Sequence, residues 1–282
     1  MDYKRKIDFA IKLLRSIPKD GPVEISYSGG KDSDVILELA KMAGIDYRAI
    51  YKSTTIDPPG TIQHAREMGA EVLRPKMSFY EIICKMGWPN MFTRFCCKYL
   101  KEYKVLDRAV QGIRREESRK RAARYKEPEY CRLYSKGEKV RIYLPILEWT
   151  TEDVARFIEE RGIKCAPHYY DEQGCFHPER RLGCICCPLQ SKKLRRETFK
   201  RYPGMLKFYL RGGQEFFDTH PDSKTKSRFD GNIYDKMLYE LFFDHFEDYE
   251  NVMKPGLFLE DRVDSKAFLE EYFGMDLTIK KK

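Results

Sequence analysis

The turn SYSGGKDSDV, at residues 26–35, constrains the fold of this chain more than any other stretch. An apolar run at residues 23–28 predicts a strand before the turn, and the spacing of apolar residues at 33–42 predicts a helix after it. Adjacent glycines let a ligand approach the backbone, and the N–H groups at a helix N-terminus attract phosphate. The turn therefore favours a phosphate-binding loop, with a plain glycine turn and an Asp or Ser helix cap as the alternative.

Strand and helix patterns alternate through the first half of the chain. Further strands are predicted at residues 47–52, 71–73 and 109–113, with a last strand or extended segment at 143–149. Further helices are predicted at 60–68, 79–86 and 152–161. Such alternation predicts an α/β fold, in which a parallel twisted sheet of about five or six strands carries helices on both faces. We expect this α/β domain to span residues 1–190 and a mostly helical extension to span 191–282.

The side chains of the turn suit a phosphate ligand. Lys31 supplies a positive charge, and the hydroxyls of Ser28 and Ser33 can donate hydrogen bonds. Asp32 would cap the helix or help to hold a magnesium ion. The pattern is neither a Walker A loop, in which Ser or Thr follows the lysine, nor GxGxxG.

The sequence SGGKDS resembles the signature of the PP-loop ATP pyrophosphatases. The resemblance implies that the β- and γ-phosphates of ATP are held by Ser28, Gly29, Gly30, Lys31, Asp32 and Ser33. It also implies attack at the α-phosphate, an adenylylated substrate and release of pyrophosphate, with Mg²⁺ as the usual bridge. Such catalysis works mainly by positioning and charge neutralisation.

Further motifs resemble the family of proteins like phosphoadenosine-phosphosulfate (PAPS) reductase. The segment STTIDPPGT at 53–61, which contains Thr54, resembles the second motif of that family, and GIRREESR at 112–119 resembles its GxRxxES segment. An arginine of the latter, here Arg114, contacts substrate phosphate or sulfate in the family, as suits a bidentate guanidinium. The resemblance, which extends over roughly residues 20–190, implies catalytic roles for Lys31, Asp32 and Arg114 and a nucleotide contact for Thr54.

Two departures from the true sulfonucleotide reductases bear on the activity. Those reductases resemble this chain but have a degraded phosphate loop and a nucleophilic cysteine near the C-terminus. Here the loop is intact, and no cysteine follows Cys187. We therefore expect an ATP-dependent adenylyltransferase or sulfurtransferase, served by a sulfur donor protein or acting on nucleic acid. A PAPS or adenylyl-sulfate reductase is the first alternative, and a non-catalytic nucleotide-binding subunit of a nucleic-acid modification or defence complex is the second.

Nine cysteines suggest metal or redox chemistry more than disulfides in a cytosolic protein. The pairs Cys96-Cys97 and Cys184-x-x-Cys187 resemble the ligand set of the [4Fe–4S] cluster in adenylyl-sulfate reductases, which implies these four cysteines as ligands. A zinc site on the same residues, or ordinary free thiols, are the alternatives.

The sequence leaves the roles of two more cysteines undecided. Cys186 could replace one of the four ligands or remain free to handle sulfur. Cys175 precedes His177 at a spacing that can bind metal. If the protein is a reductase, Cys186 or Cys175 would have to be its nucleophile.

Net charge and hydropathy limit the kinds of partner that this protein can have. The net charge of +9 and the basic clusters at 114–124 and 192–201 indicate either solvated helix faces or an anionic partner, such as a nucleotide or nucleic acid. An aromatic run at 234–249 could stack on bases, although its helical spacing favours a buried face. No apolar run reaches the roughly 18 residues of a membrane span, and the N-terminus lacks the features of a signal peptide, so we expect a cytoplasmic protein with no membrane partner.

Overall fold

The chain forms two compact units in a computed structural model that describes residues 2–134, 137–253 and 263–279. The first unit comprises Met1–Lys76 and Lys98–Gly183, and the second comprises Met77–Cys97 and Cys184–Lys282. A domain boundary at residue 190 stays a prediction. The compact units instead divide at 183/184, and residues 77–97 group with the C-terminal helices.

The first unit is an α/β structure. Its strands are β1 (Val23–Tyr27), β2 (Tyr47–Lys52), β3 (Glu71–Leu73), β4 (Arg108–Val110), β5 (Glu129–Leu133) and β6 (Lys139–Tyr143). Its helices are α1 (Tyr3–Arg15), α2 (Lys31–Ala43), α3 (Thr61–Glu67), α6 (Arg119–Arg124) and α7 (Thr151–Glu160), with the short 3₁₀ helices η1 (Arg115–Glu117) and η2 (Pro167–Tyr169).

The described strands build one six-stranded sheet in the order β3-β2-β1-β4-β6-β5. All neighbouring strands run parallel except β5, which pairs antiparallel with β6 at the edge. The predicted α/β fold is confirmed. The chain adds β2 and β3 on one side of β1 and β4 on the other, which makes the crevice between β1 and β4 a topological switch point.

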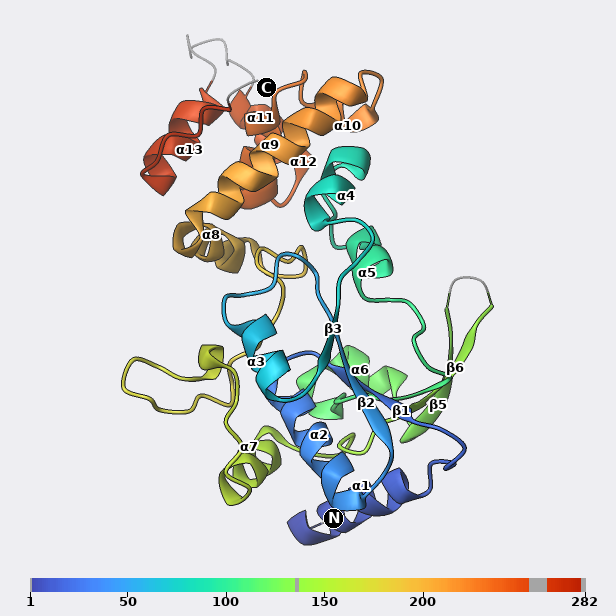
Figure 1. Cartoon of the computed structure of the whole chain (residues 1–282). Coiled ribbons are helices and arrows are strands. Elements are labelled where there is room, and N and C mark those ends of the chain that lie inside the picture. Colours follow the sequence, from blue (N-terminus) through green and yellow to red (C-terminus); the bar gives the residue numbers. More distant parts are fainter. Residues whose placement is uncertain (1, 135–136, 254–262, 280–282) are drawn as a thin grey trace. The chain divides into compact units, whose positions relative to one another are not determined.

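The alternation of side chains along the strands produces two apolar layers. Val110 and Tyr143 belong to the core that contains the buried faces of α1, α2 and α7, which lie together in Figure 1. Ala109 and Ile142, their neighbours in sequence, belong to a second cluster. Successive side chains of a strand point to opposite faces, so the second cluster covers the other side of the sheet.

The end of the sheet differs from the sequence prediction. The sequence predicts a last strand or extended segment at 143–149, but β6 ends at Tyr143 and residues 145–148 form turns. The apolar side chains there, including Leu144 and Leu147, are buried in the second cluster rather than in a strand. An apolar run without alternation cannot distinguish a strand from a buried turn.

The second unit is helical. It contains α4 (Phe79–Met86), α8 (Lys192–Arg201), α9 (Pro203–Thr219), α10 (Lys224–Arg228), α11 (Ile233–Phe242), α12 (Phe246–Met253) and α13 (Ser265–Phe273), and α5 (Phe95–Leu100) starts in it. Helix α4, which the sequence alternation placed among the α/β elements, packs on α9 instead. Phe79 stacks on Phe208 with ring centroids 6.2 Å apart, and the Trp88 indole donates to the Tyr209 carbonyl at 2.9 Å.

The aromatic run of the second unit forms internal contacts. Tyr239 contacts Phe229, Phe246 and Tyr249 with ring centroids 5.5–5.8 Å apart. Phe242 lies edge-on to Tyr272 at 4.9 Å. Such pairs stabilise a core beyond the area they bury, so this run has a structural role. No helix within residues 2–134, 137–253 and 263–279 has the length and apolar character to cross a membrane.

A buried charge network joins α8 to α11. Lys236 and Arg195 contact the Glu240 carboxylate at 2.8 and 3.3 Å. Burial opposes ionisation of this carboxyl, but the two cations outweigh it and lower the pKa of Glu240 to about 2. The network therefore stabilises the helical unit while Glu240 is ionised.

We expect Glu240→Gln to lower the free energy of unfolding by about 3 kcal/mol at pH 7, because it leaves two buried cations without a counter-charge. The pKa is lowered in the folded state, so the advantage of the wild type is present above pH 4.5 and is lost as the pH falls toward 2. Urea denaturation at several pH values measures this difference. Glu197→Gln, on an exposed position of α8, is the control and should change little; equal effects of the two substitutions would contradict the prediction.

Candidate functional site

Three loops meet at one edge of the sheet. Strands β1, β2 and β4 are parallel, so their carboxyl ends lie on the same side. The loops that leave them carry residues 28–30, 53–57 and 111–114, which are the motifs singled out in the sequence. A ligand of a parallel sheet binds at this edge, beside the switch point.

The turn after β1 depends on Gly29. Its φ of +75° lies in the left-handed region, and a Cβ there would approach Thr61 Cγ2 to 2.7 Å. Gly30 follows in the N-cap position of α2 and offers no capping side chain. The Ser33 hydroxyl donates to the Gly30 carbonyl at 2.6 Å, and the Ser28 and Ser33 hydroxyls lie 3.3 Å apart. The helix N-terminus thus presents backbone N–H groups and partial positive charge, as a phosphate requires.

Asp32 joins two cations at this edge. Its Oδ2 accepts from the Lys31 ammonium at 3.1 Å, and its Oδ1 accepts from Arg114 Nε at 2.6 Å. Lys31 and Arg114 are both buried. Gly112 permits the approach of the two loops, because a Cβ there would stand 2.9 Å from the Asp32 carbonyl oxygen. Asp32 therefore does not cap α2. Each of its oxygens accepts one of these contacts and keeps a lone pair for a further ligand, so a role in holding Mg²⁺ stays a prediction.

Arg114 is fixed from several directions. Its Nη1 group contacts Glu116 Oε2 at 2.9 Å, Thr151 Oγ1 at 3.3 Å and the Trp149 carbonyl at 3.4 Å. A guanidinium held in this way is already oriented before any ligand arrives, which lowers the cost of binding an anion. It is the only residue of the GIRREES segment that contacts the glycine turn in the described hydrogen bonds and ion pairs.

The second motif forms a turn around Asp57. This carboxylate accepts from the Thr54 hydroxyl at 2.6 Å, the Thr54 N–H at 2.8 Å and the Ser53 hydroxyl at 2.9 Å. Thr54 is buried, and Thr55 has a φ of +63°. The sequence named Thr54 as a nucleotide contact but gave no role to Asp57, which organises the turn.

A buried polar cluster lies beneath the turn. Asp34 is fully buried on α2 and accepts from the Tyr27 hydroxyl; its Oδ1 also lies 3.0 Å from His64 Nε2. The Cys165 thiol interacts with the same carboxyl, while Oδ2 makes no hydrogen bond of ordinary geometry within the described residues. Burial raises the pKa of Asp34, and the contacts with His64, Tyr27 and Cys165 oppose that rise.

Sequence reasoning missed this cluster. The sequence places Asp34 in the helix start and leaves His64 equally consistent with the surface, yet His64 is buried. The signal available was weak, since Asp34 lies one residue beyond the recognised motif and thirty residues before His64. Only the packing of α3 beside α2 joins them.

The cysteines of the two pairs lie in the second unit. The Cys97 thiol, burial and the Cys187 thiol together raise the pKa of Cys96, which places all three within electrostatic range. The Tyr209 hydroxyl donates to the Cys186 carbonyl at 3.1 Å and interacts with Cys96 and Cys187. Cys184 joins them through its carbonyl, which accepts from the Cys187 N–H at 3.3 Å.

The thiol set has the donor chemistry of an iron–sulfur site, in which each thiolate holds a different iron. In the described part of the chain, however, no three His, Cys, Asp or Glu side chains are gathered as the ligands of a metal ion. Burial raises the pKa of Cys186 to about 12. Cys175 is exposed, and His177 beside it bonds to Asp171 at 2.9 Å and Glu179 at 3.0 Å rather than to the thiol.

Comparison with known protein families assigns the chain to one of them. The family model for the phosphoadenosine phosphosulfate reductase domain matches residues 22–190. The chain belongs to this family, which confirms the resemblance found in the motifs. The match begins just before β1 and includes the glycine turn, the Asp57 turn, Arg114 and both cysteine pairs.

Curated relatives share part of their length with this chain. An uncharacterized 37.8 kDa protein of Escherichia phage 186 is 33% identical over 47% of this chain and 42% of its own length. An uncharacterized protein of Methanocaldococcus jannaschii is 30% identical over 67% of this chain and 48% of its own. Sulfate adenylyltransferase subunit 2 of Shewanella pealeana is 26% identical over 58% and 66%. The chain thus spans about half the length of the first two relatives.

Solved structures give a weaker likeness. The PAPS reductase of Candida auris has a TM-score of 0.42 and 15% identity over 64% of this chain and 93% of its own. The U34-tRNA thiolase NcsA of Methanococcus maripaludis, solved with its [4Fe–4S] cluster, has a TM-score of 0.40 and 14% identity over 79% and 81%. The family assignment therefore rests on the sequence match.

The buried cluster makes a prediction about pH. The pKa of Asp34 is raised in the folded state, so this group contributes stability below pH 3.8 that is lost as the pH rises through its folded pKa. We expect Asp34→Asn to remove that loss. The free energy of unfolding of the variant, minus that of the wild type, should then rise with pH above 3.8 in urea titrations.

Asp46→Asn is the matched control, because Asp46 is exposed in the same unit. Its difference from the wild type should stay flat with pH. A difference for Asp34→Asn that falls as the pH rises would mean that Asp34 is held as a carboxylate by His64, which would contradict the assigned direction.

Proposed function

We propose that this protein is a PP-loop ATP pyrophosphatase that adenylylates a substrate and releases pyrophosphate, in sulfur transfer or nucleic-acid modification. The observation that carries the proposal is the pairing of Lys31 and Arg114 with one carboxylate, Asp32, at the uncapped N-terminus of α2. Two buried cations beside the amides of the helix N-terminus suit the polyphosphate of a nucleotide. The family match and the similarity to a sulfate adenylyltransferase subunit support it.

The reaction follows from the charges at the turn. A substrate oxygen forms a bond to the α-phosphorus of ATP, the bridge between the α- and β-phosphates breaks, and pyrophosphate leaves with the electron pair. Lys31 and the amides after Gly29 neutralise the charge that develops on the leaving group. Arg114, held by Glu116 and Trp149, orients the α-phosphate or the substrate anion. Both cations exchange part of their contact with Asp32 for the nucleotide.

The role of Asp32 in this account is to hold Lys31 and Arg114 in place. A buried cation without a counter-charge is costly, so the carboxylate keeps both cations in position while no nucleotide is bound. Thr54 and Asp57 support the same edge by closing the turn after β2. The nucleotide contact of Thr54 then comes through the backbone of this turn, since its hydroxyl is engaged with Asp57.

The cysteine pairs belong to the proposal as a second site. Cys96, Cys97, Cys184 and Cys187 would hold a [4Fe–4S] cluster, which would be structural or would carry sulfur when bound. The interaction of Cys96 with Cys97 and Cys187 supports this set, and the buried Tyr209 fixes the backbone between Cys184 and Cys187. A sulfur donor protein and an acceptor would be the partners. Sulfate adenylyltransferase subunit 2, by its name, is itself one part of an assembly.

Removal of the loop lysine tests the leading function. Lys31→Ala should lower pyrophosphate release from ATP by at least about 100-fold, because the leaving group loses its closest positive charge. Labelled-ATP turnover, with and without added nucleic acid, is the measurement. Lys41→Ala is the control on the same helix, where the side chain is half-exposed and pairs with Glu38.

Three outcomes would contradict this function. Unchanged release in Lys31→Ala would remove the loop from the mechanism. Sulfite release from PAPS or adenylyl sulfate without ATP would identify a reductase instead, and ATP binding without turnover would identify a non-catalytic subunit.

Anaerobic purification tests the metal site. We expect a coloured protein that contains iron and acid-labile sulfide, and we expect Cys96→Ala and Cys187→Ala to lose both, since each removes one thiolate of the set. Visible absorption with iron, sulfide and zinc analysis measures this. Cys131→Ala, on an exposed cysteine of the first unit, should retain the colour. A colourless wild type that contains zinc would replace the cluster by a zinc site.

A further inference from the structure

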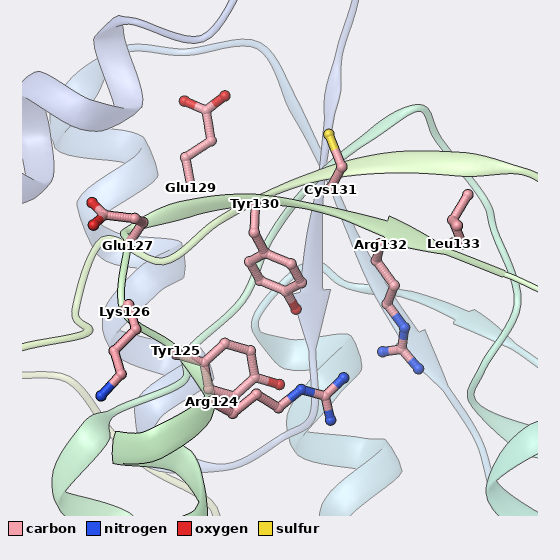
Figure 2. A pocket seen from close by; sticks show the side chains of 9 residues that line it. All are labelled: Arg124, Tyr125, Lys126, Glu127, Glu129, Tyr130, Cys131, Arg132 and Leu133. Atoms are coloured by element: carbon pink, nitrogen blue, oxygen red, sulfur yellow. The ribbon is translucent and has the colours of Figure 1, made fainter.

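A cavity of about 500 Å³ lies along the edge strand β5 in the first unit, outside the motifs discussed above (Figure 2). It is lined by Arg124, Tyr125, Lys126, Glu127, Glu129, Tyr130, Cys131, Arg132 and Leu133. The volume falls in the range of sites for small ligands or single nucleotides. The lining comes from the end of α6 and from β5, two elements that follow Arg114 along the chain.

The side chains of β5 divide between two sides of the strand. In Figure 2, Tyr130 and Arg132 extend to one side, while Glu129 and Cys131 extend to the other. The strand alternates between half-buried and exposed positions in the same way. Arg124 and Tyr125 approach the side of Tyr130 and Arg132. We call these four residues, Arg124, Tyr125, Tyr130 and Arg132, the tyrosine–arginine face.

The rings and guanidiniums of this face position one another. Tyr125 and Tyr130 lie with ring centroids 5.4 Å apart. The Arg124 guanidinium lies 5.4 Å from the Tyr125 ring, and that of Arg132 lies 4.7 Å from the Tyr134 ring. The rings also pack on the second apolar cluster of the sheet. The guanidiniums are therefore held over a rigid aromatic base instead of moving freely in solvent.

The Tyr130 hydroxyl of the face stays protonated. Burial, then the charge and hydrogen bond of Tyr125, raise the pKa of Tyr130, while Arg132 and Arg124 oppose the rise. Both guanidiniums therefore act on this hydroxyl. The face therefore offers phenol hydroxyl and guanidinium groups, which form a donor set for the oxygens of a phosphate.

The carboxylates near the cavity are mostly neutralised. Glu129, on the other side of β5, pairs with Arg141 at 3.2 Å, and Arg132 has Glu102 as its counter-charge at 3.3 Å. Glu127 points away from the face in Figure 2. Arg124 and Lys126 form no ion pair with any residue in the described ranges, and neither do Arg119 and Lys120 on α6. The surface around the cavity is therefore positive.

We propose that the tyrosine–arginine face binds the phosphodiester backbone of a single-stranded nucleic acid. Aromatic rings interleaved with cations in a concave site accommodate one strand with its bases turned out, whereas a stiff duplex cannot enter a cavity of this size. The neighbouring cations Arg119, Lys120 and Lys126 extend the positive path along α6. The inference rests on the proposed function in one respect only. If that function is correct, this inference identifies the acceptor substrate, or the molecule that carries it, as a nucleic acid.

The test measures binding without ATP, so its outcome is separate from that of the pyrophosphate assay. Fluorescence anisotropy of the full chain with labelled single-stranded RNA, single-stranded DNA and a duplex of equal length gives the affinities. We expect either single strand to bind more tightly than the duplex. Arg124→Gln/Arg132→Gln should weaken that binding by roughly tenfold or more at moderate salt.

The salt dependence adds an independent readout. The slope of log K against log salt should become shallower by about 0.7 for each phosphate of a single strand that the variant no longer neutralises. Arg156→Gln is the matched control, because its guanidinium also lies over a tyrosine ring, that of Tyr3, at 4.2 Å but outside the cavity. It should leave both affinity and slope close to those of the wild type.

One single variant separates weaker binding from a loss of the folded state. Arg124 is exposed, so Arg124→Gln alone should melt at the wild-type temperature and still show a weaker affinity and a shallower slope. Equal binding by Arg124→Gln/Arg132→Gln and Arg156→Gln would overturn the proposal. Preference for the duplex, or no binding of any of the three nucleic acids by the wild type, would overturn it as well.

Discussion

The carboxylate of Asp32 is the contact on which the candidate site depends. It lies in the first turn of α2, after β1, and pairs there with Lys31; across the switch point it pairs with Arg114, which follows β4. Without it, two buried cations would repel each other in a region where charges are weakly screened. One acidic side chain therefore allows the sheet to hold two positive groups beside an uncapped helix.

Several parts of the fold order the edge of the sheet at which we propose that an anion binds. The turn at Gly29 exposes backbone amides, the Asp57 carboxylate closes the turn after β2, and Glu116 and Thr151 fix Arg114. Beneath them, the fully buried Asp34 ties α2 to β1 and α3. Preorganisation of this kind lowers the entropic cost of binding and keeps donors in place as charge develops. The face along β5 shows the same principle, since its guanidiniums lie over tyrosine rings.

Local patterns predicted several strands and helices of the structure. The strands 47–52 and 71–73 and the helix 79–86 match the structure residue for residue, because their apolar periodicity and caps are local signals. Strand β5 was missed, since its sequence, EYCRL, alternates with few apolar residues and pairs only at the edge of the sheet. The grouping of α4 with the C-terminal helices was also beyond sequence reasoning, because it depends on aromatic contacts between Phe79 and Phe208, far apart in the chain.

The sequence by itself determined the family, the α/β fold and the identity of the glycine turn, because these reside in contiguous motifs whose order can be read along the chain. Tertiary structure decided which charges meet. By sequence alone Asp32 could cap the helix or help to hold a magnesium ion, and only the fold pairs it with Arg114, 82 residues later. Likewise His64 gained its partner Asp34, and Cys96 came within electrostatic range of Cys187 beside Tyr209. Such pairings depend on how distant segments pack, which no local pattern records.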